Sequence, residues 1–205
     1  MSVSSSQHEG LRDRKRREMY QHLTETGLKL FSDKGFEATT LDDIASTAGI
    51  ARRTFFNYFS SKEEIILHWQ NGLPDALYGE IIGRGKTAAP FALVSEALMT
   101  MTINMSPDIA MLIAKITQST EQLRLGNQMK FLKMEEAAYA ALRKLWPEAE
   151  SAQTLKIAAM AGVGAMRLAV DLWLSEACSK PLGQYLDSNM HSLKSTVLLP
   201  DIADR

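Results

Sequence analysis

The chain has 205 residues, 45% of them hydrophobic and 23% charged, with a formal net charge of −1. That hydrophobic content is enough for a buried core, so a chain disordered throughout is excluded, and any surface for nucleic acid must be local. The single cysteine, Cys178, excludes disulfide frameworks and cysteine-based zinc sites, and the four histidines lack metal-ligand spacing. We therefore expect no metal and no cofactor.

The N-terminal segment is polar and basic and lacks the apolar core of a signal peptide. The longest apolar stretch, residues 157–174, is interrupted by Arg167 and Asp171. A membrane span of about 20 residues rarely holds two charges one helical turn apart. We expect a cytoplasmic protein with no membrane partner.

Residues 1–11 have no periodic pattern and predict a flexible N-terminal arm. From Leu11 to Asp33 the apolar residues recur at helical spacing, which predicts a first helix. Gly35 follows it and tolerates a positive φ, so it is the expected stop signal.

A second, short helix is predicted to begin at Thr40. Thr40 can act as its cap, with Asp43 three residues later completing a short capping box. Gly49 ends this helix, and another short helix follows within residues 51–59. The sequence thus predicts two short helices joined by a glycine turn, at about residues 40–59.

A longer connecting helix is predicted over residues 62–72, with Ser61 and Glu64 as its capping box and Gly72 and Pro74 as its end. Helix-boundary signals later in the chain predict further helices at residues 75–82, 91–105, 107–119, 127–145, 151–178 and 182–197. No segment has the pattern of a strand. The predicted fold class is all-α, with a small helical domain at residues 12–61 and a larger one at 73–205.

The segment around the glycine turn has the composition that a helix-turn-helix needs. Two closely crossing helices require a small residue on the first, a glycine at the turn and large apolar anchors on the second. The residues in these positions are Ala45, Gly49, Phe55 and Phe59.

The second short helix also offers an exposed face with groups that can read DNA. Arginine bonds guanine, asparagine bonds adenine and an aromatic edge contacts the thymine methyl group. The expected base-contacting residues are Arg52, Arg53, Phe56 and Asn57. Hydroxyls and an ammonium nearby suit phosphate contacts, and the expected residues are Thr40, Thr54, Tyr58 and Lys62.

This segment resembles the DNA-binding signature of the TetR family of bacterial transcriptional regulators. The matching residues are Asp42–Ala45, Ala48–Ile50, Thr54–Phe55, Tyr58–Phe59 and Ser61–Glu63. Ala51 departs from the pattern, because many relatives carry a capping residue there. The resemblance implies a DNA-binding N-terminal domain followed by a helical domain that binds a small effector and dimerises.

A basic cluster at residues 12–17 precedes the matching segment. It could contact the DNA backbone or the minor groove beside the recognised site. It could equally be a solvated charge run, and the sequence leaves both readings open.

The second domain carries no catalytic motif, so we expect no enzyme and no catalytic residue. Methionines suit an adaptable apolar pocket, and a polar pair could anchor an effector in it or form an ion pair. The expected pocket residues are Met101, Met105, Met134, Arg167 and Asp171. The helix at 151–178 is apolar nearly all round, which favours a homodimer over a central helix of a monomer. The expected interface residues are Gly162, Met166, Val170 and Trp173.

These features predict a sequence-specific DNA-binding regulator, a repressor released from a palindromic operator by a small hydrophobic or amphipathic effector. An activator, or a regulator that needs no effector, is the alternative. A helical adaptor that does not bind DNA is a more remote one. A helical enzyme would need convergent acid and base groups, which the sequence does not offer.

Overall fold

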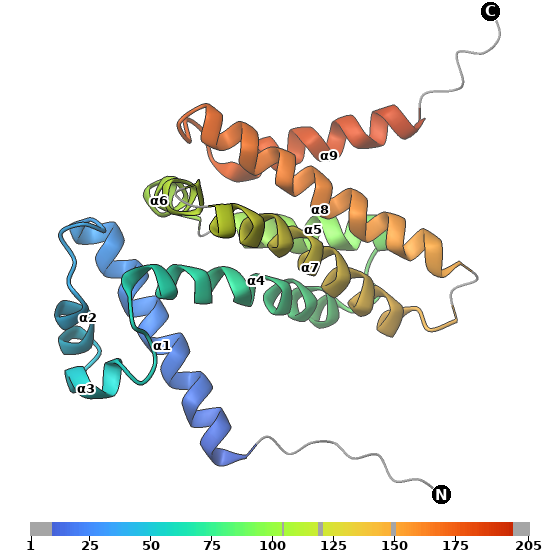
Figure 1. Ribbon diagram of the computed structural model, residues 1–205. Helices are drawn as coiled ribbons and strands as arrows, with labels where there is room; N and C mark the ends of the chain where they lie inside the picture. The colour runs from blue at the N-terminus through green and yellow to red at the C-terminus, as the bar shows by residue number, and fades with distance from the viewer. Residues whose placement is uncertain (1–9, 104, 119–120, 149–150, 199–205) are drawn as a thin grey trace, which may run out of the picture. The chain divides into compact units, whose positions relative to one another are not determined.

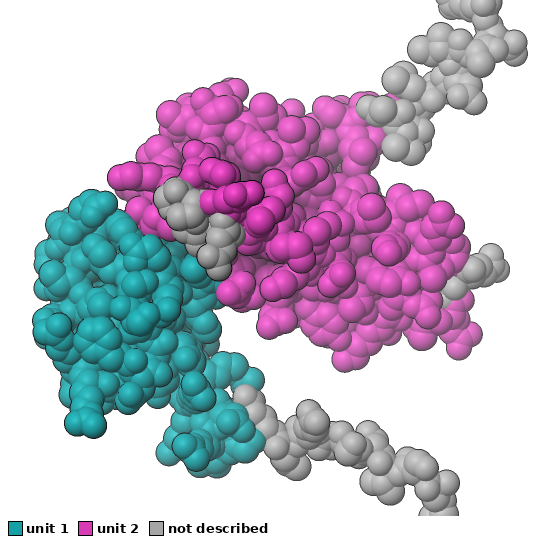
Figure 2. All heavy atoms as spheres, in the orientation of Figure 1, with its two compact units in different colours: residues 1–69 teal, residues 70–205 magenta. Residues whose placement is uncertain are grey.

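The computed structural model describes residues 10–103, 105–118, 121–148 and 151–198. Every regular element within these ranges is an α-helix, which confirms the predicted all-α fold (Figure 1). The helices form two compact units, Met1–Trp69 and Gln70–Arg205, called unit 1 and unit 2 (Figure 2). The arm predicted for residues 1–11 lies outside the described residues except at its last two positions.

Unit 1 contains α1 (Leu11–Lys34), α2 (Leu41–Thr47), α3 (Arg52–Phe55) and the first part of α4 (Lys62–Arg84). Its core is built from side chains that leave almost no accessible surface: Leu23, Phe31, Ile44, Phe55, Phe59, Ile65 and Ile66. Helices α1 and α4 approach closely at Gly27, where an added Cβ would lie 3.1 Å from the Ile65 side chain. The small residue therefore permits the contact on which the unit is built.

Helix α4 corrects the prediction that Gly72 and Pro74 end the connecting helix. A single helix runs from Lys62 to Arg84 with Pro74 inside it. An internal proline costs about 3 kcal/mol, because it removes one backbone hydrogen bond. Buried Leu77 and Ile81 lie beyond it, and burying each such side chain contributes about 1.5–3 kcal/mol. Packing therefore outweighs the local stop signal.

The start of α4 differs in detail from the predicted capping box. The Ser61 hydroxyl accepts from the Glu64 backbone N–H at 3.3 Å, as predicted. The Glu64 carboxylate, however, accepts from the backbone N–H and the hydroxyl of Ser60, at 2.7 and 2.8 Å. These bonds from Ser60 lower the pKa of Glu64.

Unit 2 contains the rest of α4 and α5 (Pro90–Thr102), α6 (Pro107–Gln118), α7 (Glu121–Leu145), α8 (Ala152–Ser175) and α9 (Leu182–Leu198). Helix α8 packs against α5, α7 and α9, and its Trp173 Nε1 donates to the Lys180 carbonyl at 2.8 Å. Among the described helices α8 alone is long and apolar enough to cross a membrane. Its packing on three neighbours buries 44% of its most apolar stretch, so contacts within the chain account for part of that apolar character.

Helix α7 begins at Glu121, six residues before the predicted start at Asn127. Gly126 lies inside this helix, although glycine commonly marks a helix boundary. An added Cβ at Gly126 would meet nothing within 4 Å. A glycine inside a helix costs only about 1 kcal/mol, so neighbouring residues can carry the helix through it.

Candidate nucleic-acid interface

The turn between α2 and α3 rests on buried side chains from both helices. Ala45 is 2% exposed, Phe55 is fully buried and Phe59 is 2% exposed. Gly49 adopts a φ of 71°, which favours glycine, and the Ile50 N–H donates to the Ala45 carbonyl at 3.0 Å. This core fixes the direction in which the residues after the turn leave α2.

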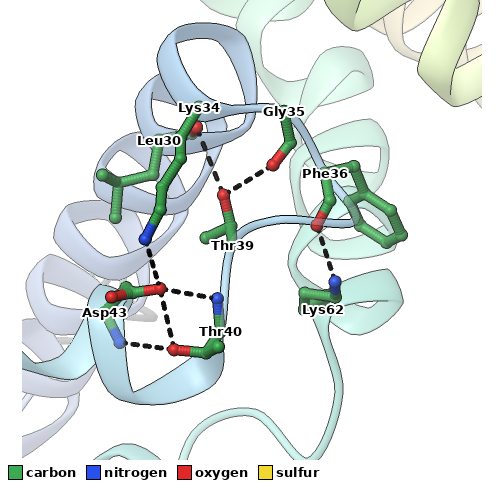
Figure 3. Close-up of polar contacts among 8 residues, drawn as sticks. All are labelled: Leu30, Lys34, Gly35, Phe36, Thr39, Thr40, Asp43 and Lys62. Carbon is green, nitrogen blue, oxygen red and sulfur yellow. Dashed lines mark hydrogen bonds and ion pairs between the residues drawn. The ribbon is translucent and has the colours of Figure 1, made fainter.

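The start of α2 is fixed by the predicted capping box, which the structure confirms. The Asp43 N–H donates to the Thr40 hydroxyl at 3.0 Å, and the Asp43 carboxylate accepts from the Thr40 N–H at 2.9 Å (Figure 3). Lys34 donates to the same carboxylate at 2.8 Å. Hydrogen bonds from Lys34 and from Thr40 hold the pKa of Asp43 well below its usual range. The network ties α2 to the end of α1.

The turn before α2 adds a second anchor. Gly35 has a φ of 89°, and the Thr39 hydroxyl donates to the Gly35 carbonyl at 2.7 Å (Figure 3). Phe36 follows the glycine and stacks edge-on against Phe31, with ring centroids 4.9 Å apart. Local bonds and an aromatic contact together set the path from α1 to α2.

All four residues expected to contact bases are exposed. Arg52 bonds Asp42 at 2.9 Å, and its guanidinium lies 5.6 Å from the Phe56 ring centroid. Ala51 at the start of α3 makes no side-chain capping bond. The short α3 and the residues just after it therefore present Arg53 and Asn57 to solvent, beside an Arg52 that already forms an ion pair with Asp42.

The residues expected to contact phosphates are placed less uniformly. Thr40 is exposed, whereas Thr54 and Tyr58 are half-buried. The Lys62 ammonium donates to the Phe36 carbonyl at 2.6 Å and lies 4.4 Å from the Phe36 ring (Figure 3). In this structure Lys62 therefore ties α4 to the turn after α1.

Tyr20 is a residue that the sequence reasoning missed. Its ring lies 5.0 Å from that of Tyr58 and 5.3 Å from that of Phe59, both edge-on, and it stacks on His68 at 4.9 Å. Burial lowers the pKa of His68. Tyr20 therefore sets the position of Tyr58. Its place on α1 gave no local signal, because the contact joins residues far apart in the sequence.

In unit 2 the structure separates the five residues expected to form a pocket. Met134 is buried, and Met101 and Met105 pack against the same core. Arg167 and Asp171 lie on the exposed side of α8. They influence α7 instead: burial raises the pKa of Glu135 against the attraction of Arg167, and burial lowers the pKa of Lys130 to about 8 against that of Asp171.

The structure buries most of the residues expected at a dimer interface in the core of unit 2. An added Cβ at Gly162 would lie 2.5 Å from Val94, and Met166 and Trp173 are 6% and 1% exposed. Only Val170 is half-buried. Side chains buried within one chain leave little surface for a second copy, whereas other apolar residues of α8 are exposed. These are Ile157, Met160, Leu168 and Leu172.

Among known proteins, residues 23–68 match the sequence pattern of the family of bacterial regulatory proteins called the tetR family. The regulator TcmR of Streptomyces glaucescens is 35% identical over 88 residues, 43% of this chain and 39% of TcmR. The repressor KstR2 of Mycobacterium tuberculosis is 31% identical over 127 residues, 60% of each chain. The chain thus spans less than two thirds of the length of these curated relatives.

Solved structures share the fold over most of the chain. FadR of Thermus thermophilus, a TetR-family repressor in complex with lauroyl-CoA, superposes with a TM-score of 0.60. The two sequences are 17% identical, and the match covers 91% of this chain and 98% of FadR. A Bacillus subtilis FadR in complex with stearoyl-CoA gives a TM-score of 0.55 at 14% identity, over 85% of this chain and 97% of that one.

Proposed function

The chain belongs to the TetR family of bacterial regulatory proteins, and we propose that it is a sequence-specific DNA-binding repressor of transcription. The observation that carries the proposal is the exposure of Arg53 within α3 and of Asn57 just after it, on a helix-turn-helix anchored by buried Phe55 and Phe59. Base readout in a major groove requires hydrogen-bond donors that are exposed to solvent and held in position by a packed core.

Arg52 takes part in this readout together with Asp42. Their ion pair is exposed on both sides, with 67% and 56% of the two side chains accessible, so it contributes little to stability. A guanine edge can replace the carboxylate and accept two hydrogen bonds from Arg52. Asp42 then acts against unspecific binding, since its charge repels phosphate wherever a suitable base is missing.

The proposed regulator acts as a homodimer. Ile157, Met160, Leu168 and Leu172 are spaced three, eight and four positions apart, which places them on one face of α8, and they are 40–58% exposed. Such a stripe on one helix face suits a two-fold interface with a second copy. We call residues 52–58 the recognition segment. A two-fold dimer presents two copies of it, which matches a palindromic operator.

The proposed effector is a small molecule with a long apolar chain that binds in unit 2. The methionine-containing core supports this, because methionine adapts to irregular apolar ligands. The FadR proteins that share the fold were solved with acyl-CoA. Effector and operator then oppose each other through a coupling of about 1–3 kcal/mol. We expect a cytoplasmic binding protein and no catalytic reaction.

Selection of bound sequences from a random double-stranded DNA pool tests the proposal. We expect the wild type to enrich a palindrome. The double variant Arg53→Ala, Asn57→Ala should lose that enrichment. The double variant Gln128→Ala, Lys133→Ala removes the same charge and one amide from exposed positions of α7 and should keep it. A folded wild-type protein that enriches no sequence contradicts the proposed function.

Repression and effector release are tested with the selected operator. Placed over a promoter in a reporter strain, it should lower expression when the protein is present, whereas an activator raises expression from an upstream site. Lauroyl-CoA should weaken operator binding in an anisotropy titration, and free CoA at the same concentration should not. Equal effects of both compounds would contradict an apolar effector.

A further inference from the structure

The first two turns of α1, residues 11–18, form a helical extension whose residues are all exposed. The first fully buried side chain of α1 is Leu23. Figure 1 shows the N-terminal end of α1 continuing past α3. The extension holds five cationic residues, Arg12, Arg14, Lys15, Arg16 and Arg17. Cations near a helix N-terminus oppose the helix dipole, so helix stability does not explain them.

One face of the extension and the residues just after α3 form the two walls of an open groove of about 740 Å³. It is lined by Leu11, Arg12, Lys15, Arg16, Met19, Asn57 and Tyr58. None of these described lining residues is acidic, and three are cationic. The groove therefore offers hydrogen-bond donors and positive charge to an anion that passes the recognition segment.

The other cations of the extension lie on the opposite face. Residues 12, 15, 16 and 19 share one side of an α-helix, since they are three or four positions apart. Arg14 lies away from them and pairs with Glu18 at 3.5 Å. The extension is therefore two-sided, with a cationic face toward the groove and a face with internal charge pairing away from it.

The two walls of the groove are held in register by aromatic contacts. The Arg16 guanidinium lies 5.7 Å from the Tyr20 ring, and Tyr20 contacts Tyr58 at 5.0 Å. A DNA strand that meets Tyr58 therefore meets the cationic face of α1 at a fixed offset. Arg12 and Arg16 are about 6 Å apart along the helix axis, comparable to the rise of two nucleotides at 3.4 Å each.

From this arrangement we propose that Arg12, Lys15 and Arg16 bind the DNA phosphate backbone that flanks the bases read by α3. The proposal rests on the proposed function and extends the interface beyond the helix-turn-helix. Phosphate contacts fix register and carry no base information. The extension thus raises affinity and makes it salt-dependent, while the recognised sequence stays the same.

Two double variants of identical composition test the proposal. Arg12→Ala, Arg16→Ala removes two arginines from the groove face, and Arg14→Ala, Arg17→Ala removes two from the opposite face. Operator affinity is measured by anisotropy over about 50–300 mM salt, on a duplex selected with the wild type and flanked on both sides. Thermal unfolding checks that both variants remain folded.

Each phosphate contact contributes about 0.9 to the slope of log affinity against log salt. We expect the groove variant to lower that slope by about 2 per half-site, or about 4 for a dimer on its operator. The opposite-face variant should change it by less than half as much. Both variants should select the same sequence as the wild type.

Equal slopes for the two variants would overturn the inference, because the effect would then be one of net charge alone. A changed selected sequence in the groove variant would overturn the assignment to phosphates. If the wild type selects no sequence, the proposed function itself fails. If it selects a sequence and the variants do not differ, only the further inference fails.

Discussion

Gly162 is the position where sequence pattern and structure disagree most sharply about the role of α8. The pattern placed it at a dimer interface, whereas in the structure an added Cβ would lie 2.5 Å from Val94 Cγ1 and 3.4 Å from Val94 Cβ. Heavy atoms in contact normally lie about 3.5–4.0 Å apart. The substitution Gly162→Ala must therefore push α8 and α5 apart or force Val94 into another rotamer.

The expected magnitude follows from two opposing effects. Alanine gains about 1 kcal/mol over glycine in a helix, and overpacking a core costs about 1–3 kcal/mol. The net loss for Gly162→Ala is therefore about 1 kcal/mol. Val94→Ala alone removes two buried methyl groups and should cost about 2–3 kcal/mol. In the Val94→Ala variant the side chain that clashes is absent, so adding Gly162→Ala should raise the free energy of unfolding by about 1 kcal/mol.

The wild type, the two single variants and the double variant form a double-mutant cycle. Urea unfolding of these four proteins, at one fixed protein concentration, measures the coupling free energy between positions 94 and 162, which should be about 2 kcal/mol. Gly79→Ala on α4 is the matched control, because an added Cβ there meets nothing within 4 Å. It should stabilise by about 0.5–1 kcal/mol. If Gly162→Ala stabilises the wild type as much as Gly79→Ala does, the assignment of Gly162 to the core is refuted.

Three further outcomes are expected. Leu168→Asp on α8 should convert the proposed dimer to a monomer in sedimentation, whereas Leu132→Asp on α7 should not, although the two leucines are 52% and 50% exposed. Equal behaviour of the two variants would reject the exposed apolar residues of α8 as the interface. The folded state lowers the pKa of Asp43, so its bonds stabilise above the ordinary pKa of about 4 and are lost as pH falls below it. The Tm of Asp43→Asn should therefore approach that of the wild type with falling pH, and a constant difference would contradict the network. Ala51→Ser supplies the missing cap of α3 and should raise the free energy of unfolding by about 0.5–1 kcal/mol in urea titrations, with no gain expected if α3 forms only on DNA.

Much of unit 1 could be predicted because its signals are local. The capping box of Thr40 and Asp43, and the positive φ of Gly35 and Gly49, depend on residues within one turn of each other. The exposed face with Arg53 and Asn57 follows from the helical period once Phe55 is placed in the core. Such features depend on residues that are close together in the sequence. The spacing of caps, glycines and apolar residues was therefore enough to propose a segment that reads DNA.

The roles of Lys62 and Tyr20 depended on contacts between distant segments. Lys62 reaches the carbonyl of Phe36, and Tyr20 contacts Tyr58, from positions 26 and 38 residues away in the chain. No local pattern encodes such a contact. The two-sided character of the basic residues at the start of α1 became visible only when the groove beside Asn57 placed one face against it.

The sequence by itself determined the helical fold, most helix boundaries and the DNA-reading segment, because helical period, caps and turns act over a few residues. Tertiary structure alone decided that α4 continues through Pro74, that Met134 and Trp173 lie in the core, and that Leu168 lies outside. A helix that is apolar on several faces can bury any of them. Which face is buried depends on the neighbours that pack against it, and these come from elsewhere in the chain.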